Sequence, residues 1–198
     1  MTKRATLLKL PLLVVVFALA PSAWSAEKSS PNTQVSSPVI VFWEGHQHLA
    51  PIGLKCPSDH LDISSYSYSK LEVFGNGQAD RVEWSLPPCR EPAKNLPWTV
   101  PVGSKVRRFA VPSQELDNLR EFLNQPDVAV LTFFAFDVGW AGDYEIEISR
   151  PSGVQKIEVV NLEPNHSGFE HDPTLLRLIC MAKRVGGDQS PTWCHDLP

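Results

Sequence analysis

The chain has 198 residues, 42% of them hydrophobic, and carries a formal net charge of −4 at pH 7. This length allows one principal domain with a single core. The acidic balance disfavours nucleic acid and anionic membrane surfaces as partners, because both require a basic surface, and the one basic cluster, KVRRF at residues 105–109, is short.

The N-terminus has the three parts of a secretory signal peptide. Basic Lys3, Arg4 and Lys9 precede the apolar run at residues 10–20, and small residues follow it. The run is shorter than the roughly 20 residues of a spanning helix, which disfavours the alternative of an uncleaved anchor. We expect a signal peptide over residues 1–25, cleaved after Ser25 or, as the alternative, one residue later.

Export to the periplasm or the cell exterior follows from this prediction. Cleavage would remove three positive and no negative charges, so the formal charge would fall from −4 to −7. Residues 26–37 have almost no apolar side chain and predict a flexible leader. Residues 38–198 would then form a single domain without a further run of spanning length.

The cysteines are Cys56, Cys89, Cys180 and Cys194. An even number in an exported chain predicts two disulfides, for which three pairings exist. We favour Cys56–Cys89 and Cys180–Cys194, because each pair is close in sequence. A free reactive thiol is the alternative.

The first half of the domain predicts strands and one helix. A short strand is expected at residues 39–43, then a long polar stretch from Glu44 to about Ser67. Polar and apolar residues alternate on both sides of Gly75-Asn76-Gly77, which indicates a hairpin. A strand at 104–111 leads to a helix with Ser113 as its N-cap, four apolar residues on one face, and its end at Pro126.

The second half repeats this order. The apolar residues 128–136 predict a buried strand, and residues 143–162 predict a hairpin that turns at Pro151-Ser152-Gly153. The last helix would be capped by Asp172, begin at Pro173 and end at Gly186. The expected fold is α+β: an antiparallel sheet of two hairpins with two helices packed on one face, in a ββα-ββα order.

This order resembles a family of exported bacterial domains of unknown function. In that family a Cys-Pro, a tyrosine and a Y/F-G-[DN]-G hairpin precede a helix, a second hairpin and a final helix. Here Cys56-Pro57, Tyr68 and Phe74-Gly75-Asn76-Gly77 match, and the resemblance covers residues 55–185. The insertion between Cys56 and Tyr68 departs from the pattern. The resemblance implies a fold and export, and no activity.

The stretch FWEGHQHLA holds the first candidate for chemistry. His46 and His48 would point the same way on a strand, with Glu44 just before them, and could supply two ligands of a metal site. Such sites need three or four ligands, and no motif fixes the others. The remaining candidates are His60, His166, Glu170, His171 and His195. We therefore favour the alternative, a pair of surface histidines in an exposed loop, and predict no cofactor.

Two loops offer weaker candidates. Asp137, Trp140 and Asp143 could bind a sugar through carboxylates beside an aromatic ring, although turn geometry also explains them. Residues 165–173 could hold an anion at the start of the last helix, although helix capping by Asp172 explains that carboxylate.

The sequence has no G-x-S-x-G motif and no glycine-rich phosphate loop. The leading hypothesis is a non-catalytic exported domain with a binding or structural role, whose partner is a protein or a glycan. The alternative is an exported hydrolase or metal-binding protein that uses loop histidines and carboxylates.

Overall fold

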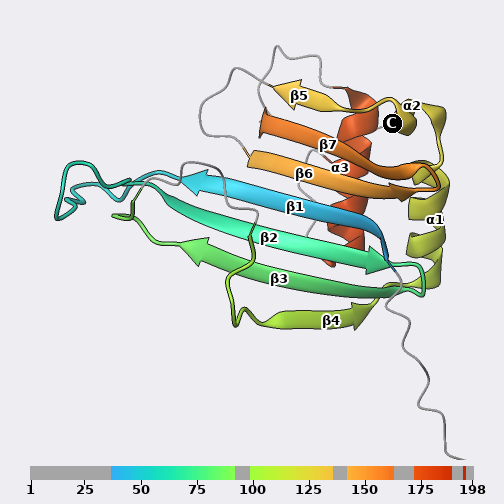
Figure 1. Ribbon diagram of the computed structural model, residues 1–198, viewed down its shortest axis with the longest axis horizontal. Coiled ribbons are helices and arrows are strands. Elements are labelled where there is room, and N and C mark those ends of the chain that lie inside the picture. Colours follow the sequence, from blue (N-terminus) through green and yellow to red (C-terminus); the bar gives the residue numbers. More distant parts are fainter. Residues whose placement is uncertain (1–36, 92–98, 136–141, 163–171, 189–193, 195–198) are drawn as a thin grey trace, which may run out of the picture. The chain divides into compact units, whose positions relative to one another are not determined.

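The computed structural model (Figure 1) describes residues 37–91, 99–135, 142–162, 172–188 and 194. The chain divides into two units, residues 1–34 and 35–198, and all described residues belong to the second. The expected signal peptide and almost all of the expected leader lie outside the described residues.

Seven strands of the described residues form one sheet in the order β4-β3-β2-β1-β6-β7-β5. Neighbouring strands are antiparallel, except that β5 runs parallel to β7. The elements are β1 (Pro38–His48), β2 (Ser65–Phe74), β3 (Gln78–Leu86), β4 (Val106–Ala110), α1 (Ser113–Leu123), α2 (Pro126–Ala129), β5 (Phe133–Ala135), β6 (Gly142–Arg150), β7 (Gly153–Leu162) and α3 (Pro173–Val185).

The α+β class and both expected hairpins, β2–β3 and β6–β7, are present. The expected sheet was too small. β1 lies between the two hairpins and pairs with β2 on one side and β6 on the other, while β4 and β5 extend the sheet at its edges. A third helix, α2, interrupts the expected ββα-ββα order.

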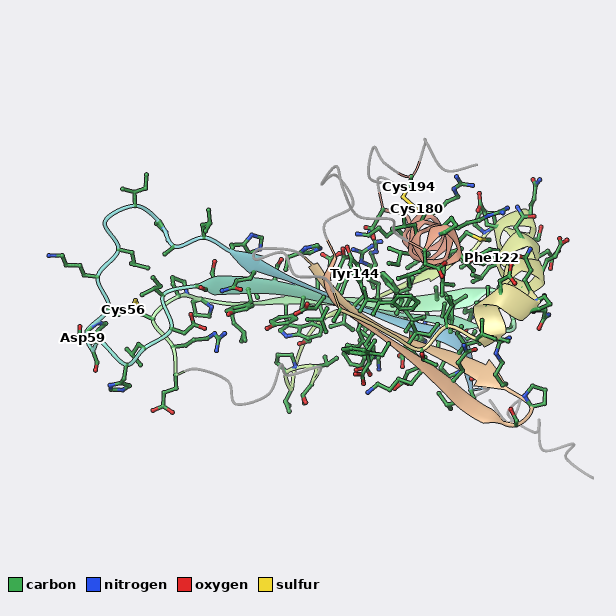
Figure 2. The ribbon with its side chains drawn as sticks, turned by 90° about the horizontal axis from the view of Figure 1, so that it is seen from above. Cys56, Asp59, Phe122, Tyr144, Cys180 and Cys194 are labelled. Atoms are coloured by element: carbon green, nitrogen blue, oxygen red, sulfur yellow. A yellow bond between two sulfur atoms is a disulfide. The ribbon has the colours of Figure 1, made fainter. Side chains whose placement is uncertain are left out.

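Helices α1 and α3 cover the same face of the sheet, as the edge view in Figure 2 shows. Alternate residues of β1, β2 and β6 point to this face, among them Phe42, Leu71 and Ile146. They pack against buried side chains of both helices, including Leu119 and Ile179. Each large aliphatic side chain buried in this way contributes about 1.5–3 kcal/mol, which makes this layer the main source of stability.

The two expected helix caps have different outcomes. Asp172 caps α3 as expected, because its carboxylate accepts from the backbone N–H groups of Thr174 at 2.8 Å and Leu175 at 3.0 Å. Ser113 is not the N-cap of α1. Pro112 takes that position, Ser113 is the first helical residue, and no side chain caps this end.

The expectation of one buried strand over residues 128–136 was wrong. Pro126 begins the short helix α2, where a missing N–H costs nothing, and the strand comprises only Phe133–Ala135. This strand lies at the sheet edge, and Phe133 is 60% exposed. A short apolar run does not distinguish helix from strand, nor edge from core.

Both favoured disulfides are present. Cys56–Cys89 joins the β1–β2 connection to the segment after β3, and Cys180–Cys194 joins α3 to the C-terminal segment. Two disulfides are consistent with an oxidising compartment outside the cytoplasm. Within the described ranges, no helix has both the length and the apolar character needed to cross a membrane.

Candidate functional site

Strands β1, β2 and β3 continue well beyond the two large helices. Figure 2 shows Cys56 and Asp59 at the end of the domain furthest from Phe122 of α1 and Cys180 of α3. β1 continues through His48, so the two histidines lie on a strand, and the expectation of an exposed loop was wrong. Pairing along the whole of β1 and β2, from His48↔Ser65 onward, explains the difference.

A cavity of about 460 Å³ with polar and aromatic lining residues, Tyr68 and Trp84 among the latter, opens on this part of the helix-bearing face. Glu44 and His46 of β1 form one wall, Ser67 and Ser69 of β2 form the floor, and β3 forms the opposite wall with Arg81, Glu83 and Ser85. Paired residues on antiparallel strands share a face, and the register places Glu44, Ser69 and Glu83 in one row and His46, Ser67 and Ser85 in the next. We call this cavity the trough.

A buried ion pair forms the inner side of the trough. Glu44 Oε1 accepts a hydrogen bond from Lys183 Nζ of α3, and the two side chains are only 8% and 11% exposed. His46 Nε2 lies 2.6 Å from the same carboxylate oxygen. Burial alone would raise the pKa of Glu44, but the hydrogen bond from His46 and the charge of Lys183 outweigh it and lower the pKa to about 2.

Tyr144 and Gly142 of β6 lie against the His46 ring. The Tyr144 ring is perpendicular to it, with 6.2 Å between the ring centres. Burial raises the pKa of the Tyr144 hydroxyl, and the charge of Glu44 raises it further, so the hydroxyl keeps its proton. A Cβ on Gly142 would lie 2.8 Å from His46 Cε1, so only glycine lets the ring take this place.

The positively charged side chains of the trough are paired with carboxylates of the protein itself. Arg81 is buried, pairs with Asp188 and, at 2.7 Å, with Glu83, and donates to the Gly186 carbonyl oxygen at 3.3 Å. Lys183 is held by Glu44. The most exposed of the lining groups named above are Glu83, 65% exposed, His46, 42% exposed, and Ser85. The trough therefore offers a ligand mainly hydrogen-bond acceptors.

We also asked whether the two histidines are arranged for proton transfer. Because Glu44 stays ionised, His46 must donate from Nε2, which leaves Nδ1 as an acceptor in the neutral ring. His48 Nε2 lies 2.8 Å from Ser67 Oγ, a serine–histidine contact. No carboxylate of the described residues is recorded in contact with the His48 ring. The contact therefore lacks the third group that orients the base in a nucleophilic triad.

The metal candidates do not converge in the part of the chain that is described. There, no three histidine, cysteine or acidic side chains lie close enough together to hold a metal ion. His46 and His48 bond to Glu44 and Ser67, and His60 lies 2.5 Å from Ser58 Oγ. The further candidates His166, Glu170, His171 and His195 lie outside the described residues, so the less favoured hypothesis of a metal site is not tested for them.

The sugar-binding candidates do not join the trough as a set. Asp137 and Trp140 lie outside the described residues. Asp143 pairs with Gly45 on β1, and strand alternation directs it to the face opposite Tyr144. Of the loop 165–173, only Asp172 and Pro173 are described, and Asp172 acts as the helix cap.

The sequence contains a signal for the trough in Ser65-Tyr66-Ser67-Tyr68-Ser69. The serines point to the trough face and the tyrosines to the other face, as the period of two requires. On that other face Tyr68 stacks on Tyr66 and on Trp84, with ring centres 6.1 and 5.3 Å apart. The alternation of serine and tyrosine indicates a strand, whereas the expectation was a polar stretch that continued to about Ser67.

Comparison with known proteins adds no further assignment. No family model matches the chain, and no curated protein matches it significantly.

Proposed function

We propose that the protein is a non-catalytic exported domain that binds a hydroxyl-bearing ligand of the glycan type in the trough. The observation that carries the proposal is the buried Glu44–Lys183 pair beside an open cavity. A buried ion pair is costly to desolvate and gives little net stability, so perturbed carboxylates of this kind gather at functional sites. The cavity volume of about 460 Å³ also falls within the range of small-ligand sites.

The chemistry of the trough selects a ligand that donates hydrogen bonds. Arg81 and Lys183 are paired with carboxylates. Of these carboxylates Glu83 is 65% exposed, so a ligand can reach it, and Ser69 and Ser85 line the cavity beside it. Sugar hydroxyls donate to carboxylates and exchange hydrogen bonds with serines. An amino group on the sugar would add attraction to Glu83, and an acid group would be repelled by it.

Export and a binding role have separate support. The N-terminal pattern is that of a signal peptide, and both disulfides suit an oxidising compartment. The resemblance to exported bacterial domains agrees with this location. Together these observations favour a ligand of the cell envelope or its surroundings.

The test is a series of three hexoses that share a ring and differ in charge: glucosamine, glucose and glucuronate. Binding to the protein is measured by calorimetry and by ligand-observed NMR. Ser85→Trp would fill the trough from an exposed position of β3. Gln78→Trp, also exposed on β3 but on the other face, is the matched control.

We expect affinity to fall in the order glucosamine, glucose, glucuronate. Ser85→Trp should abolish binding, and Gln78→Trp should leave it unchanged. The proposal would be overturned if glucuronate bound most tightly, if both tryptophan variants bound equally well, or if no hexose bound saturably.

A further inference from the structure

A second cavity, of about 430 Å³, lies between α1 and α3, away from the trough residues. Each helix lines it with one stripe at the spacing i, i+3, i+4, i+7. On α1 the stripe is Asn118, Glu121 and Phe122, continued by Gln125, the N-cap residue of α2, and on α3 it is Arg177, Cys180, Met181 and Arg184. Residues at this spacing share one face of a helix, so both stripes face the same groove.

The floor of this groove is apolar and fixed. Phe122 is buried and Met181 is partly buried against the core. Cys180 is bonded to Cys194, which also lines the groove, so the disulfide holds one side in place. A fixed apolar floor with polar groups at its rim is the usual composition of a small-molecule site.

Two arginines at the rim distinguish the groove from the trough. Arg177 and Arg184 are exposed, and neither forms an ion pair with another of the described residues. The Arg177 guanidinium stacks on Phe122, with 5.2 Å between its carbon and the ring centre. This contact fixes the direction of the side chain, and no carboxylate of the described residues pairs with its N–H groups.

The spacing of the arginines sets the size of the ligand. They are seven residues apart on α3, about 10 Å along the helix axis, and flexible side chains can shorten that span. The C-terminal position of Arg184 agrees with the helix dipole, but the dipole does not explain Arg177 in the middle of the helix. Asn118 and Gln125 add amide donors on the opposite side, where Glu121 is the acidic exception.

We propose that this groove is a second binding site, which takes a small organic dianion with one acidic group on Arg177 and the other on Arg184. A guanidinium binds a carboxylate through two parallel N–H donors, and two such pairs favour a dicarboxylate over a monocarboxylate. The site is independent of the proposed function of the trough, whose own cations are neutralised by carboxylates.

The chain offers a direct probe of this groove. Met181 lines it and is the only methionine after Met1, so a carbon-13 methyl label reports on the site alone. The protein would be titrated with glutarate, with acetate as the monoanion and with sodium chloride as the ionic-strength control. Arg177→Gln and Arg184→Gln remove one guanidinium each, and Lys105→Gln removes an exposed cation elsewhere as the matched control.

We expect the Met181 methyl signal to shift saturably with glutarate, at least fivefold more weakly with acetate, and not with chloride. Each arginine variant should weaken glutarate binding at least tenfold while its amide spectrum stays folded, and Lys105→Gln should bind as the wild type does. The proposal of a second site would be contradicted if glutarate gave no saturable shift, if acetate bound with equal affinity, or if either folded arginine variant bound glutarate as the wild type does.

Discussion

Glu44 of β1 and Lys183 of α3 lie 139 residues apart in the chain and form a buried ion pair at the edge of the core. Lys183 Nζ also lies 5.8 Å from the centre of the Tyr144 ring. The pair joins the sheet to the last turn of the helix at the inner side of the trough, where the aliphatic core ends. It therefore links the position of α3 to the shape of the trough.

Replacing Lys183 by methionine should destabilise the protein by about 3 kcal/mol at neutral pH, because it leaves the Glu44 carboxylate buried without its main counter-charge. Urea unfolding measures the loss. The double variant Glu44→Gln/Lys183→Met removes both charges and should recover most of it. A single variant that loses less than about 1 kcal/mol would show that the pair is not buried as described.

The low pKa of Glu44 should make stability depend on pH. The folded-state pKa of about 2 lies below the ordinary value of 4.5, so the unfolded chain binds the proton more readily. The contribution of Glu44, at most about 3 kcal/mol, is therefore complete above pH 4.5 and is lost as the pH falls toward 2. Unfolding free energies across this range should fall less steeply in Glu44→Gln, and parallel curves for the two proteins would refute the assignment.

Gly142→Ala should cost about 1–3 kcal/mol, because the added methyl group would meet the His46 ring at 2.8 Å and push it from Glu44. The residue is not in the left-handed region, so backbone strain does not enter. The same substitution in a His46→Ala background should cost much less, which a double-mutant cycle of thermal unfolding would measure. Equal costs in both backgrounds would mean that the contact is unimportant.

Removal of the Cys180–Cys194 disulfide, by alanine at both positions, should lower stability by about 3 kcal/mol, since the crosslink closes a loop of 14 residues. Guanidinium unfolding compares the variant with the wild type. Peptide mapping without reduction provides the control, because the intact protein must yield the linked pair. A mapped Cys56–Cys180 peptide would contradict the pairing itself.

The sequence predicts those parts of the fold whose patterns are local. Alternation around Gly75-Asn76-Gly77 and the cap at Asp172 both depend on neighbours within a few residues, and both predictions are confirmed. The predicted cap at Ser113 was wrong by one position, because Pro112 is itself the N-cap residue. The length of β1 was underestimated, since its outer half is polar and depends on pairing with β2.

The trough could be predicted only in part. Glu44 and both histidines stand out in the sequence as one short polar group. The contacts of Lys183 and Arg81 with this region cannot be predicted from it, because they depend on the packing of α3 on the sheet. The histidines were expected in a loop, because the sequence around them shows no alternation of apolar and polar side chains. In the structure, the side chains that these strands direct into the trough are charged residues, a histidine and serines. Where the side chains that pair across strands are polar, a single sequence shows no apolar periodicity from which the strands could be predicted.

Amide chemical-shift mapping of the isotope-labelled protein during titration with glucosamine would show whether the trough is the ligand site. We expect saturable shifts that centre on Ser67, Ser69, Glu83 and Ser85 and that disappear in Ser85→Trp. Shifts that centre instead on residues 49–64, the connection tied by the Cys56–Cys89 disulfide, or that persist unchanged in Ser85→Trp, would contradict it.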